Sequence, residues 1–200
     1  MRMMLLYGAK KAYTFDKYIH SKNDVTFTKN LKKWLKILNM FPQENLDNAK
    51  VTHVSSLSDI PKESIDLIFS FSVLEHISHP EEEIEALINV LSPEGRMVHF
   101  IDFRDHSDFS KPLNFLRYDK ETWNSMNPPN VFTHTNRYRL CDFERLFEKK
   151  QMKILVSEVA EEHHISEDEH SQFHPCFQKY SDRDLCALNV RIIAQKQVCV

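Results

Sequence analysis

The sequence predicts an α/β fold built on a mainly parallel sheet. In the middle of the chain an apolar run at Ile65–Phe71 is followed by an amphipathic segment at Glu81–Leu91 and a second apolar run at Arg96–Phe103. This strand–helix–strand order implies parallel strands joined by right-handed crossovers. Hydrophobic residues make up 42% of the 200 residues and charged residues 28%, so the chain is expected to form one domain with a packed core.

The composition argues against several classes of protein. A formal net charge of −3 disfavours an electrostatic nucleic-acid binder. The apolar runs are too short to span a bilayer, and the segment Met1–Tyr7 lacks the long apolar region and cleavage site of a signal peptide. The four cysteines form no C-x-x-C pair. We therefore expect a cytoplasmic protein with reduced thiols and with neither a membrane nor a nucleic acid as partner, and its oligomeric state stays open.

The N-terminal part of the chain looks like the second half of a β–α–β unit. Gly8 occupies the position after a helix that favours glycine, and a short strand is predicted at Lys11–Asp16. The segment Phe27–Phe41 has apolar residues at helical spacing, and its lysines read as the solvated face of that helix. A further, weaker strand is predicted at Lys50–Val54.

The strands and helices of the middle region carry clear signals. The near-continuous apolar run Ile65–Phe71 is typical of a strand buried on both faces of a parallel sheet. Ser78 or His79 can cap the helix at Glu81–Leu91, with Pro80 at its first position and three glutamates in its first turn. Ser92–Gly95 is predicted to be the turn before the next strand.

The C-terminal region is predicted to mix regular and irregular segments. Asp105–Pro129 shows no period except a short helix around Glu121–Met126, and such long connections are usually functional or mobile. The pattern predicts a helix at Leu140–Lys150, with two phenylalanines and a leucine facing inward, and strands at Lys153–Val159 and Leu185–Lys196.

Two further expectations concern the end of the chain. No long helical pattern precedes Leu185–Lys196, so an antiparallel edge strand is expected there. The acidic, histidine-rich segment Glu161–His174 is predicted to be an exposed loop. Its histidine spacing fits no zinc pattern, so no metal is predicted.

Two motifs between the predicted strands resemble those of a known family. Residues 72–77 read SVLEHI and residues 91–95 read LSPEG. At this spacing the pair resembles the class I S-adenosylmethionine-dependent methyltransferases, in their small-molecule branch. The likeness extends from Gly8 to about Lys196 and is strongest over Asp59–Phe103.

The resemblance implies a Rossmann-like sheet with the strand order 3-2-1-4-5-7-6 and an antiparallel last strand. The cofactor, S-adenosyl-L-methionine, would lie across the carboxyl ends of the strands at the switch point. The predicted strands would then be numbers 2 to 7 of that sheet, in chain order Lys11–Asp16, Lys50–Val54, Ile65–Phe71, Arg96–Phe103, Lys153–Val159 and Leu185–Lys196.

The sequence departs from this family in one respect. The family's glycine-rich loop follows strand 1, whereas this chain has only two glycines, Gly8 and Gly95. Strand 1 and its loop are therefore expected to be missing from an N-terminally truncated domain. The alternative is a truncated or degenerate domain that is not catalytic and binds cofactor weakly or not at all. A nicotinamide dehydrogenase is a third possibility, which the SVLEHI segment opposes.

The resemblance also implies which residues meet the cofactor. Asp16, at the end of its strand, would accept hydrogen bonds from the two ribose hydroxyls, against the plainer reading of a surface aspartate. The expected cofactor-binding residues are Asp16 for the ribose, Ser56 and Leu57 for the adenine, Phe71, Ser72 and Val73 below the methionine portion, and His76, whose role is either a contact or the shape of the turn.

The acceptor side is expected just after the strand Arg96–Phe103. His106 would act as a base toward a hydroxyl acceptor, with Asp105 or Asp102 orienting its imidazole, although a salt-bridged loop would explain the same residues. The reaction would transfer methyl to an oxygen or nitrogen of a small-molecule or glycan-type acceptor. The remaining candidate acceptor-binding residues are Asp102 itself, Arg117, Trp123, Arg137 and Arg139, with solvated surface arginines as the alternative.

Overall fold

The computed structural model describes residues 9–15, 51–129, 131 and 133–197. The chain divides into two compact units, residues 1–61 and 62–200. In the first unit, β1 (Ala12–Phe15) and β2 (Val51–Val54) pair in parallel, and the short helix η1 (Leu57–Asp59) follows. The two strands predicted for this unit are confirmed. Asp16 and the helix predicted over Phe27–Phe41 lie outside the described residues.

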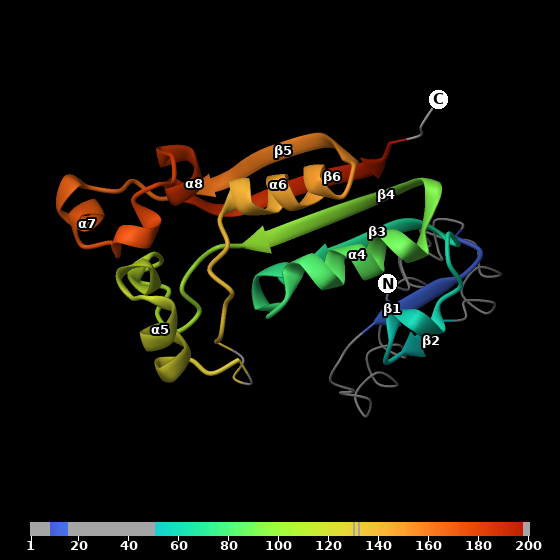
Figure 1. The fold of residues 1–200 in the computed structure, drawn as a ribbon, viewed down its shortest axis with the longest axis horizontal. Helices are drawn as coiled ribbons and strands as arrows, with labels where there is room; N and C mark the ends of the chain where they lie inside the picture. Colours follow the sequence, from blue (N-terminus) through green and yellow to red (C-terminus); the bar gives the residue numbers. More distant parts are fainter. Residues whose placement is uncertain (1–8, 16–50, 130, 132, 198–200) are drawn as a thin grey trace, which may run out of the picture. The chain divides into compact units, whose positions relative to one another are not determined.

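The second unit contains a four-stranded sheet in the order β3-β4-β6-β5 (Figure 1). Its strands are β3 (Ile65–Phe71), β4 (Leu91–Asp102), β5 (Met152–Glu162) and β6 (Ala187–Lys196). β3 and β4 are parallel, whereas β6 runs antiparallel to both β4 and β5. This is the 4-5-7-6 half of the expected order, so the α/β class is confirmed. The prediction of an edge position for the last strand is wrong, because β6 is hydrogen-bonded on both sides.

Two helices cover one face of this sheet. They are α4 (Pro80–Val90) and α6 (Leu140–Lys149), close to their predicted bounds. His79 is the N-cap of α4, although its side chain makes no capping hydrogen bond. Ile84 of α4 and Phe143 and Phe147 of α6 are fully buried against strand residues that include Met97. Burying each such side chain stabilises the fold by about 1.5–3 kcal/mol.

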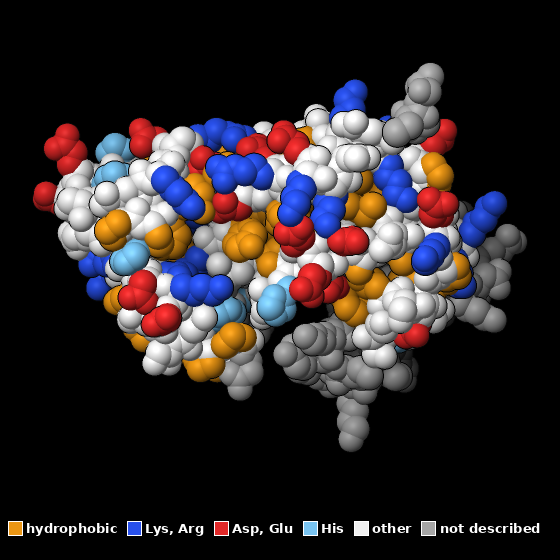
Figure 2. All heavy atoms as spheres, in the orientation of Figure 1, with side chains coloured by type: hydrophobic (Ala, Val, Ile, Leu, Met, Phe, Trp, Pro, Cys, Tyr) orange, Lys and Arg blue, Asp and Glu red, His pale blue; other side chains and the backbone are white. Residues whose placement is uncertain are grey.

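Ion pairs join the outer surfaces of the two helices. Lys149 Nζ lies 2.7 Å from Glu81 Oε1, and Lys150 Nζ lies 2.6 Å from Glu85 Oε2. Acidic and basic side chains are mingled on the face of the molecule that Figure 2 shows. Such exposed pairs contribute at most about 1 kcal/mol each, so the buried stripe rather than the surface charge holds these helices in place.

The other face of β3 is open to solvent. Leu67, Phe69 and Phe71 are 45%, 43% and 66% exposed. Alternate side chains of a strand point to opposite faces, and Ile68 contributes to the core on the side of α4 and α6. The prediction that this strand is buried on both faces is therefore wrong for one face.

Ser92–Gly95 is part of β4 rather than a separate turn. The register jumps there, from Ile65 opposite Leu91 to Leu67 opposite Arg96. A Cβ atom on Gly95 would lie 2.7 Å from the Leu91 side chain and 2.8 Å from the carbonyl oxygen of Ile65. The irregular segment can therefore pass this point only with glycine.

Gly95→Ala is expected to lower the free energy of unfolding by about 2 kcal/mol, because the backbone carbonyl of Ile65 cannot move aside cheaply. Urea denaturation of the variant measures this loss. Glu94→Ala, at the exposed neighbouring position, is the matched control and should stay within about 0.5 kcal/mol of the wild type. Equal denaturation midpoints for Gly95→Ala and the wild type would contradict the argument.

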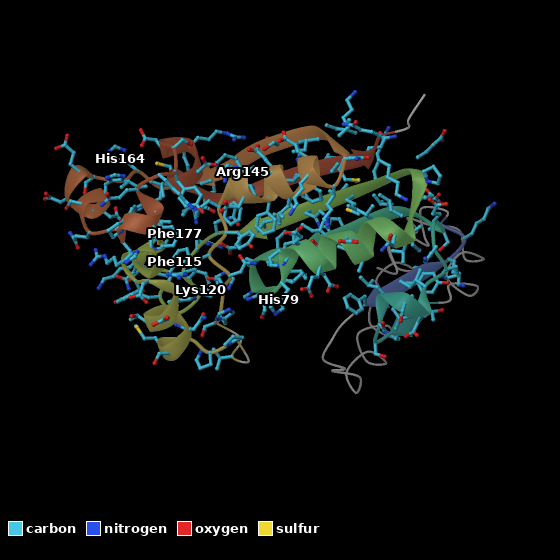
Figure 3. The ribbon with its side chains drawn as sticks, in the orientation of Figure 1. His79, Phe115, Lys120, Arg145, His164 and Phe177 are labelled. Atoms are coloured by element: carbon cyan, nitrogen blue, oxygen red, sulfur yellow. The ribbon has the colours of Figure 1, made fainter. Side chains whose placement is uncertain are left out.

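A second hydrophobic cluster lies beyond the carboxyl end of β4. Phe115, Trp123, Phe173 and Phe177 are each at most 5% exposed within it, and Figure 3 labels two of them, Phe115 and Phe177. The segment predicted as an exposed loop at Glu161–His174 therefore carries a buried phenylalanine and a short helix. The short helices of this region are η3 (Asn114–Arg117), α5 (Lys120–Met126), α7 (Glu167–Ser171), η4 (Pro175–Phe177) and α8 (Asp182–Cys186).

No helix in the described part of the chain is long and apolar enough to cross a bilayer.

Candidate functional site

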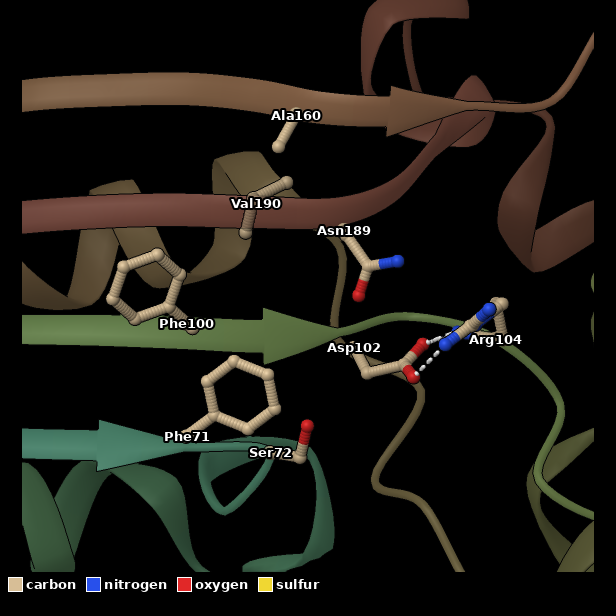
Figure 4. A pocket seen from close by; sticks show the side chains of 8 residues that line it. All are labelled: Phe71, Ser72, Phe100, Asp102, Arg104, Ala160, Asn189 and Val190. Atoms are coloured by element: carbon tan, nitrogen blue, oxygen red, sulfur yellow. Dashed lines mark hydrogen bonds and ion pairs between the residues drawn. The ribbon is translucent and has the colours of Figure 1, made fainter. Parts of the chain in front are cut away.

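A pocket of about 230 Å³ opens at the carboxyl ends of β3 and β4 (Figure 4). Aromatic rings form part of its wall and polar side chains stand around them, as in small-molecule sites. The rings of Phe71 and Phe100 are 5.7 Å apart between centroids. The residues that line the pocket are Phe71, Ser72, Phe100, Asp102, Arg104, Ala160, Asn189 and Val190.

Ser72 turns the chain away from β3 at this pocket. Its φ angle is 49°, in the left-handed region that residues other than glycine seldom adopt, and its amide donates to the carbonyl of Phe100 at 2.9 Å. The turn leaves Phe71 66% and Val73 45% exposed. Two of the three residues predicted below the cofactor, Phe71 and Ser72, therefore line the pocket, whereas Val73 does not.

The SVLEHI motif continues into a single turn, η2 (Leu74–His76). Asn136 holds this turn from another part of the chain. Its amide N–H donates to the Glu75 carbonyl at 2.7 Å, and its side-chain Nδ2 donates to the carbonyls of Leu74 and Ile77 at 2.8 and 3.0 Å. Three hydrogen bonds to carbonyls of this turn and its C-cap fix the orientation of the side chains of the turn.

The side chain of Glu75 points into the protein. It is 1% exposed, and neither carboxylate oxygen has a hydrogen-bond partner among the described residues. Burial raises the pKa of Glu75 to about 7. The carboxyl group therefore titrates near neutral pH.

Two histidines stand beside Glu75. The rings of His76 and His106 meet edge to face, with centroids 4.8 Å apart. Nδ1 of His76 donates to the carbonyl of His134 at 2.7 Å, and Nε2 lies 4.0 Å from Glu75 Oε1. Burial lowers the pKa of His76, which favours its neutral form.

Asp102 connects this group of side chains to the pocket. Arg104 donates to it from Nε at 2.8 Å and from Nη2 at 2.5 Å, and Nε2 of His106 lies 3.7 Å from its Oδ2 (Figure 4 shows the Arg104 bonds). Burial alone would raise the pKa of Asp102, but His106 and Arg104 together hold this pKa well below its usual range. The carboxylate therefore stays ionised at the rim of the pocket.

Asp105 has a different role. Its Oδ1 accepts hydrogen bonds from the amide of Ser107 at 2.9 Å and from the Ser107 hydroxyl. Of the two aspartates predicted to orient His106, only Asp102 lies within ion-pair distance of it.

The predicted adenine-binding residues lie in the first unit. Ser56 caps η1 and accepts a hydrogen bond from the amide of Ser58 at 3.2 Å, and Leu57 is buried. Asp16, predicted for the ribose, lies outside the described residues.

The predicted acceptor-binding arginines lie in the core. The guanidinium of Arg139 is fully buried and donates to four backbone carbonyls, and Arg137 donates to the carbonyls of Phe115 and Tyr118. Trp123 is 2% exposed and donates to the carbonyl of Thr135. Backbone carbonyls therefore already bind donors of these three side chains, and their role toward an acceptor stays a prediction. Arg117 is exposed and does not line the pocket.

Sequence reasoning missed Asn136 and Asn189. Asn136 reaches the SVLEHI turn from 60 residues further along the chain, and Asn189 reaches the pocket from β6. No periodic pattern marks either residue, since each is placed by pairing between distant segments.

The chain matches a family model described as a methyltransferase domain over residues 5–156. This range includes both motifs, the strands β1 to β4 and the first five residues of β5. No curated protein matches the chain.

Solved structures share the fold. YcgJ from Bacillus subtilis superimposes with a TM-score of 0.51 at 12% identity over 98% of this chain and 87% of its own. A candidate S-adenosylmethionine-dependent methyltransferase from Listeria monocytogenes gives a TM-score of 0.50 at 14% identity over 98% and 86%. A candidate methyltransferase from Bacillus halodurans gives 0.50 at 11% over 94% and 84%.

At these identities the solved structures establish the fold alone, and the match to the family model establishes membership of the family. The resemblance read from the SVLEHI and LSPEG motifs is thereby confirmed. The chain belongs to the methyltransferase-domain family and has the fold of the class I methyltransferases, which use S-adenosylmethionine as methyl donor.

Proposed function

We propose that this chain binds S-adenosylmethionine and transfers its methyl group to an oxygen or nitrogen of a small-molecule or glycan-type acceptor. The observation that carries the proposal is the pocket at the carboxyl ends of β3 and β4, with the ionised Asp102 in its lining and Nε2 of His106 3.7 Å from that carboxylate. Open α/β sheets bind their ligands at this edge. The size of the pocket suits a small acceptor group.

Methyl transfer from a sulfonium requires few catalytic groups of the protein. The acceptor's lone pair forms a bond to the methyl carbon while the bond from that carbon to the sulfonium sulfur breaks, and S-adenosylhomocysteine leaves as a neutral thioether. A hydroxyl acceptor must also lose its proton. The protein therefore has to hold the two reactants in line and provide a base.

The residues of the second unit supply these functions in the proposal. Phe100 offers an apolar wall for the acceptor, and Asn189 offers a hydrogen bond. His106 takes the proton, and Asp102 stabilises the imidazolium that forms. Arg104 keeps Asp102 ionised for this purpose.

The cofactor side of the proposal follows the family resemblance. Asp16 would hold the ribose and Ser56 and Leu57 the adenine. Phe71, Ser72 and Val73 would lie along the methionine portion. His76, with its Nδ1 bound to a backbone carbonyl, keeps the motif turn in shape beside them.

The test is methyl transfer from donor labelled in the methyl group to a panel of hydroxyl and amine acceptors, with S-adenosylhomocysteine as the second readout. His106→Gln is expected to lower kcat for hydroxyl acceptors by about 100-fold, the lower end of the usual contribution of a general base. His164→Gln, which changes an exposed histidine far along the chain (Figure 3), should leave kcat unchanged.

Two results would count against the proposal. Unchanged kcat in His106→Gln would remove the base from the mechanism. Failure of the wild type to methylate any member of the panel would favour the second candidate function, a non-catalytic domain. The two-glycine composition favours that candidate, because a glycine-rich loop lets the backbone approach the cofactor.

A further inference from the structure

Three side chains from the segments that follow β3 and β4 lie together as metal ligands do. Glu75, His76 and His106 each offer one ligand atom, and these atoms all lie within 4.8 Å of one another. Glu75 and His76 come from the η2 turn, and His106 comes from the loop after β4. The group therefore joins two segments that follow parallel neighbouring strands.

The carboxylate of Glu75 gives a second, independent indication. The residue is 1% exposed, and both of its oxygens lack a hydrogen-bond partner among the described residues. A buried polar group without partners costs free energy, and proteins seldom keep one without a purpose. The carboxylate is aimed at the two imidazoles, so a cation between the three groups would supply the missing interaction.

Contacts with neighbouring groups orient these side chains, as is usual for metal ligands. Nδ1 of His76 is fixed by the carbonyl of His134, which sets the orientation of the ring. Asn136 fixes the backbone of Glu75 at 2.7 Å. Asp102 Oδ2 lies 3.7 Å from Nε2 of His106 and places a carboxylate beside the second imidazole.

We propose that Glu75, His76 and His106 form a binding site for a divalent first-row transition-metal ion, with Zn²⁺ as the representative. Two imidazoles and one carboxylate are a typical ligand set for these metals, whereas Mg²⁺ and Ca²⁺ prefer sites made of oxygen atoms alone. An ion about 2.1 Å from each ligand atom requires those atoms to be about 3–3.5 Å apart. The side chains must therefore close by about 1 Å from their present positions.

Three protein ligands leave at least one coordination position of the ion open. If the proposed function holds, an acceptor hydroxyl can enter such a position, where the ion would lower the pKa of the hydroxyl so that its proton passes to water without a protein base. Metal binding itself does not depend on methyl transfer, so each can be tested alone.

The experiment uses the full chain after removal of metal with a chelator. Titration calorimetry with Zn²⁺ is expected to show one site with a dissociation constant of about 1 μM or tighter. The visible absorption of added Co²⁺ should report imidazole ligation at the same stoichiometry. Glu75→Gln and His106→Gln should each weaken Zn²⁺ binding by about 10–100-fold.

The controls are Glu167→Gln and His164→Gln, which make the same chemical changes at exposed positions. Both lie in the histidine-rich segment, so they also test whether that segment holds the ion. Their Zn²⁺ affinity should equal that of the wild type within about twofold.

Two outcomes would overturn the site. One is a wild type that binds Zn²⁺ no tighter than about 100 μM. The other is folded Glu75→Gln and His106→Gln variants, checked by circular dichroism, that bind Zn²⁺ as tightly as the wild type. If Glu75→Gln does not fold, His106→Gln decides alone. Tight, Glu75-dependent binding in a chain that methylates nothing would support the metal site and contradict the proposed function.

Discussion

Replacing Arg139 by methionine is expected to lower the free energy of unfolding by about 4 kcal/mol. The guanidinium is fully buried and donates to the carbonyl oxygens of Phe103, Asp184 and Leu185 at 3.0, 2.9 and 2.9 Å. A fourth bond, at 2.5 Å, reaches Ala187. Each carbonyl that loses its donor inside the protein costs about 1–3 kcal/mol, partly recovered where the structure relaxes.

The effect is large because Arg139 alone donates to carbonyls of two separate segments inside the core. Phe103 follows β4, whereas residues 184–187 lead from α8 into β6. The cation also lies 4.9 Å from the centre of the Phe103 ring. Burial lowers the pKa of Arg139 to about 10, so the group stays charged at neutral pH. Lysine cannot replace it, because a single ammonium cannot reach carbonyls in such different directions.

Urea denaturation followed by circular dichroism measures this loss. The matched control is Arg145→Met on the exposed side of α6, where the side chain is 67% exposed (Figure 3), and it should change the free energy by less than about 1 kcal/mol. If the two variants unfold at the same urea concentration, the role assigned to Arg139 is wrong.

The second large expected effect is a loss of folding stability at low pH. His99 of β4 is fully buried beneath α6, its ring stacks on Phe147, and Nδ1 lies 2.7 Å from the Ser70 hydroxyl. Burial lowers the pKa of His99 to about 4. The imidazole of His99 therefore stays neutral in the folded protein, whereas in the unfolded chain it binds a proton below about pH 6.5.

The sign follows from this difference in proton binding. The contribution of His99 to stability is fully present above pH 6.5 and is lost as the pH falls toward 4, because only the unfolded state then binds the proton. The loss amounts to about 3 kcal/mol over that range.

In a variant without this imidazole, the free energy of unfolding should fall less as the pH is lowered. His99→Gln is expected to be less stable than the wild type at pH 7, where it loses the ring packing, and to lose about 3 kcal/mol less between pH 7 and pH 4. His164→Gln keeps the wild-type slope as the control, because this histidine is exposed. Parallel pH profiles for His99→Gln and the wild type would contradict the assignment.

Local sequence signals were enough for the regular elements of the second unit. The run Ile65–Phe71 is β3 to the residue, and Pro80 begins α4 as predicted. These signals act over a few neighbouring residues, and so they can be read from the chain. The open face of β3 could not be predicted in this way, since an apolar side chain does not reveal whether another element covers it.

The site was predictable only in part. The SVLEHI motif and the pair Asp102 and His106 could be proposed from the sequence because they lie at or just after the ends of predicted strands. The burial of Glu75 depends on Asn136, and that of Arg139 depends on carbonyls more than 30 residues away in either direction. Such long-range hydrogen bonds follow no sequence period. The sequence therefore could not show that the donors of Arg137 and Arg139 bind backbone carbonyls.

The central claim is that this chain holds S-adenosylmethionine at the carboxyl edge of its sheet. Titration calorimetry of the full chain with S-adenosylhomocysteine, the product, tests it most directly. We expect saturable one-to-one binding with a dissociation constant of about 100 μM or tighter, and no heat with NADH. Absence of binding at millimolar ligand, in a chain that circular dichroism shows to be folded, would contradict the account.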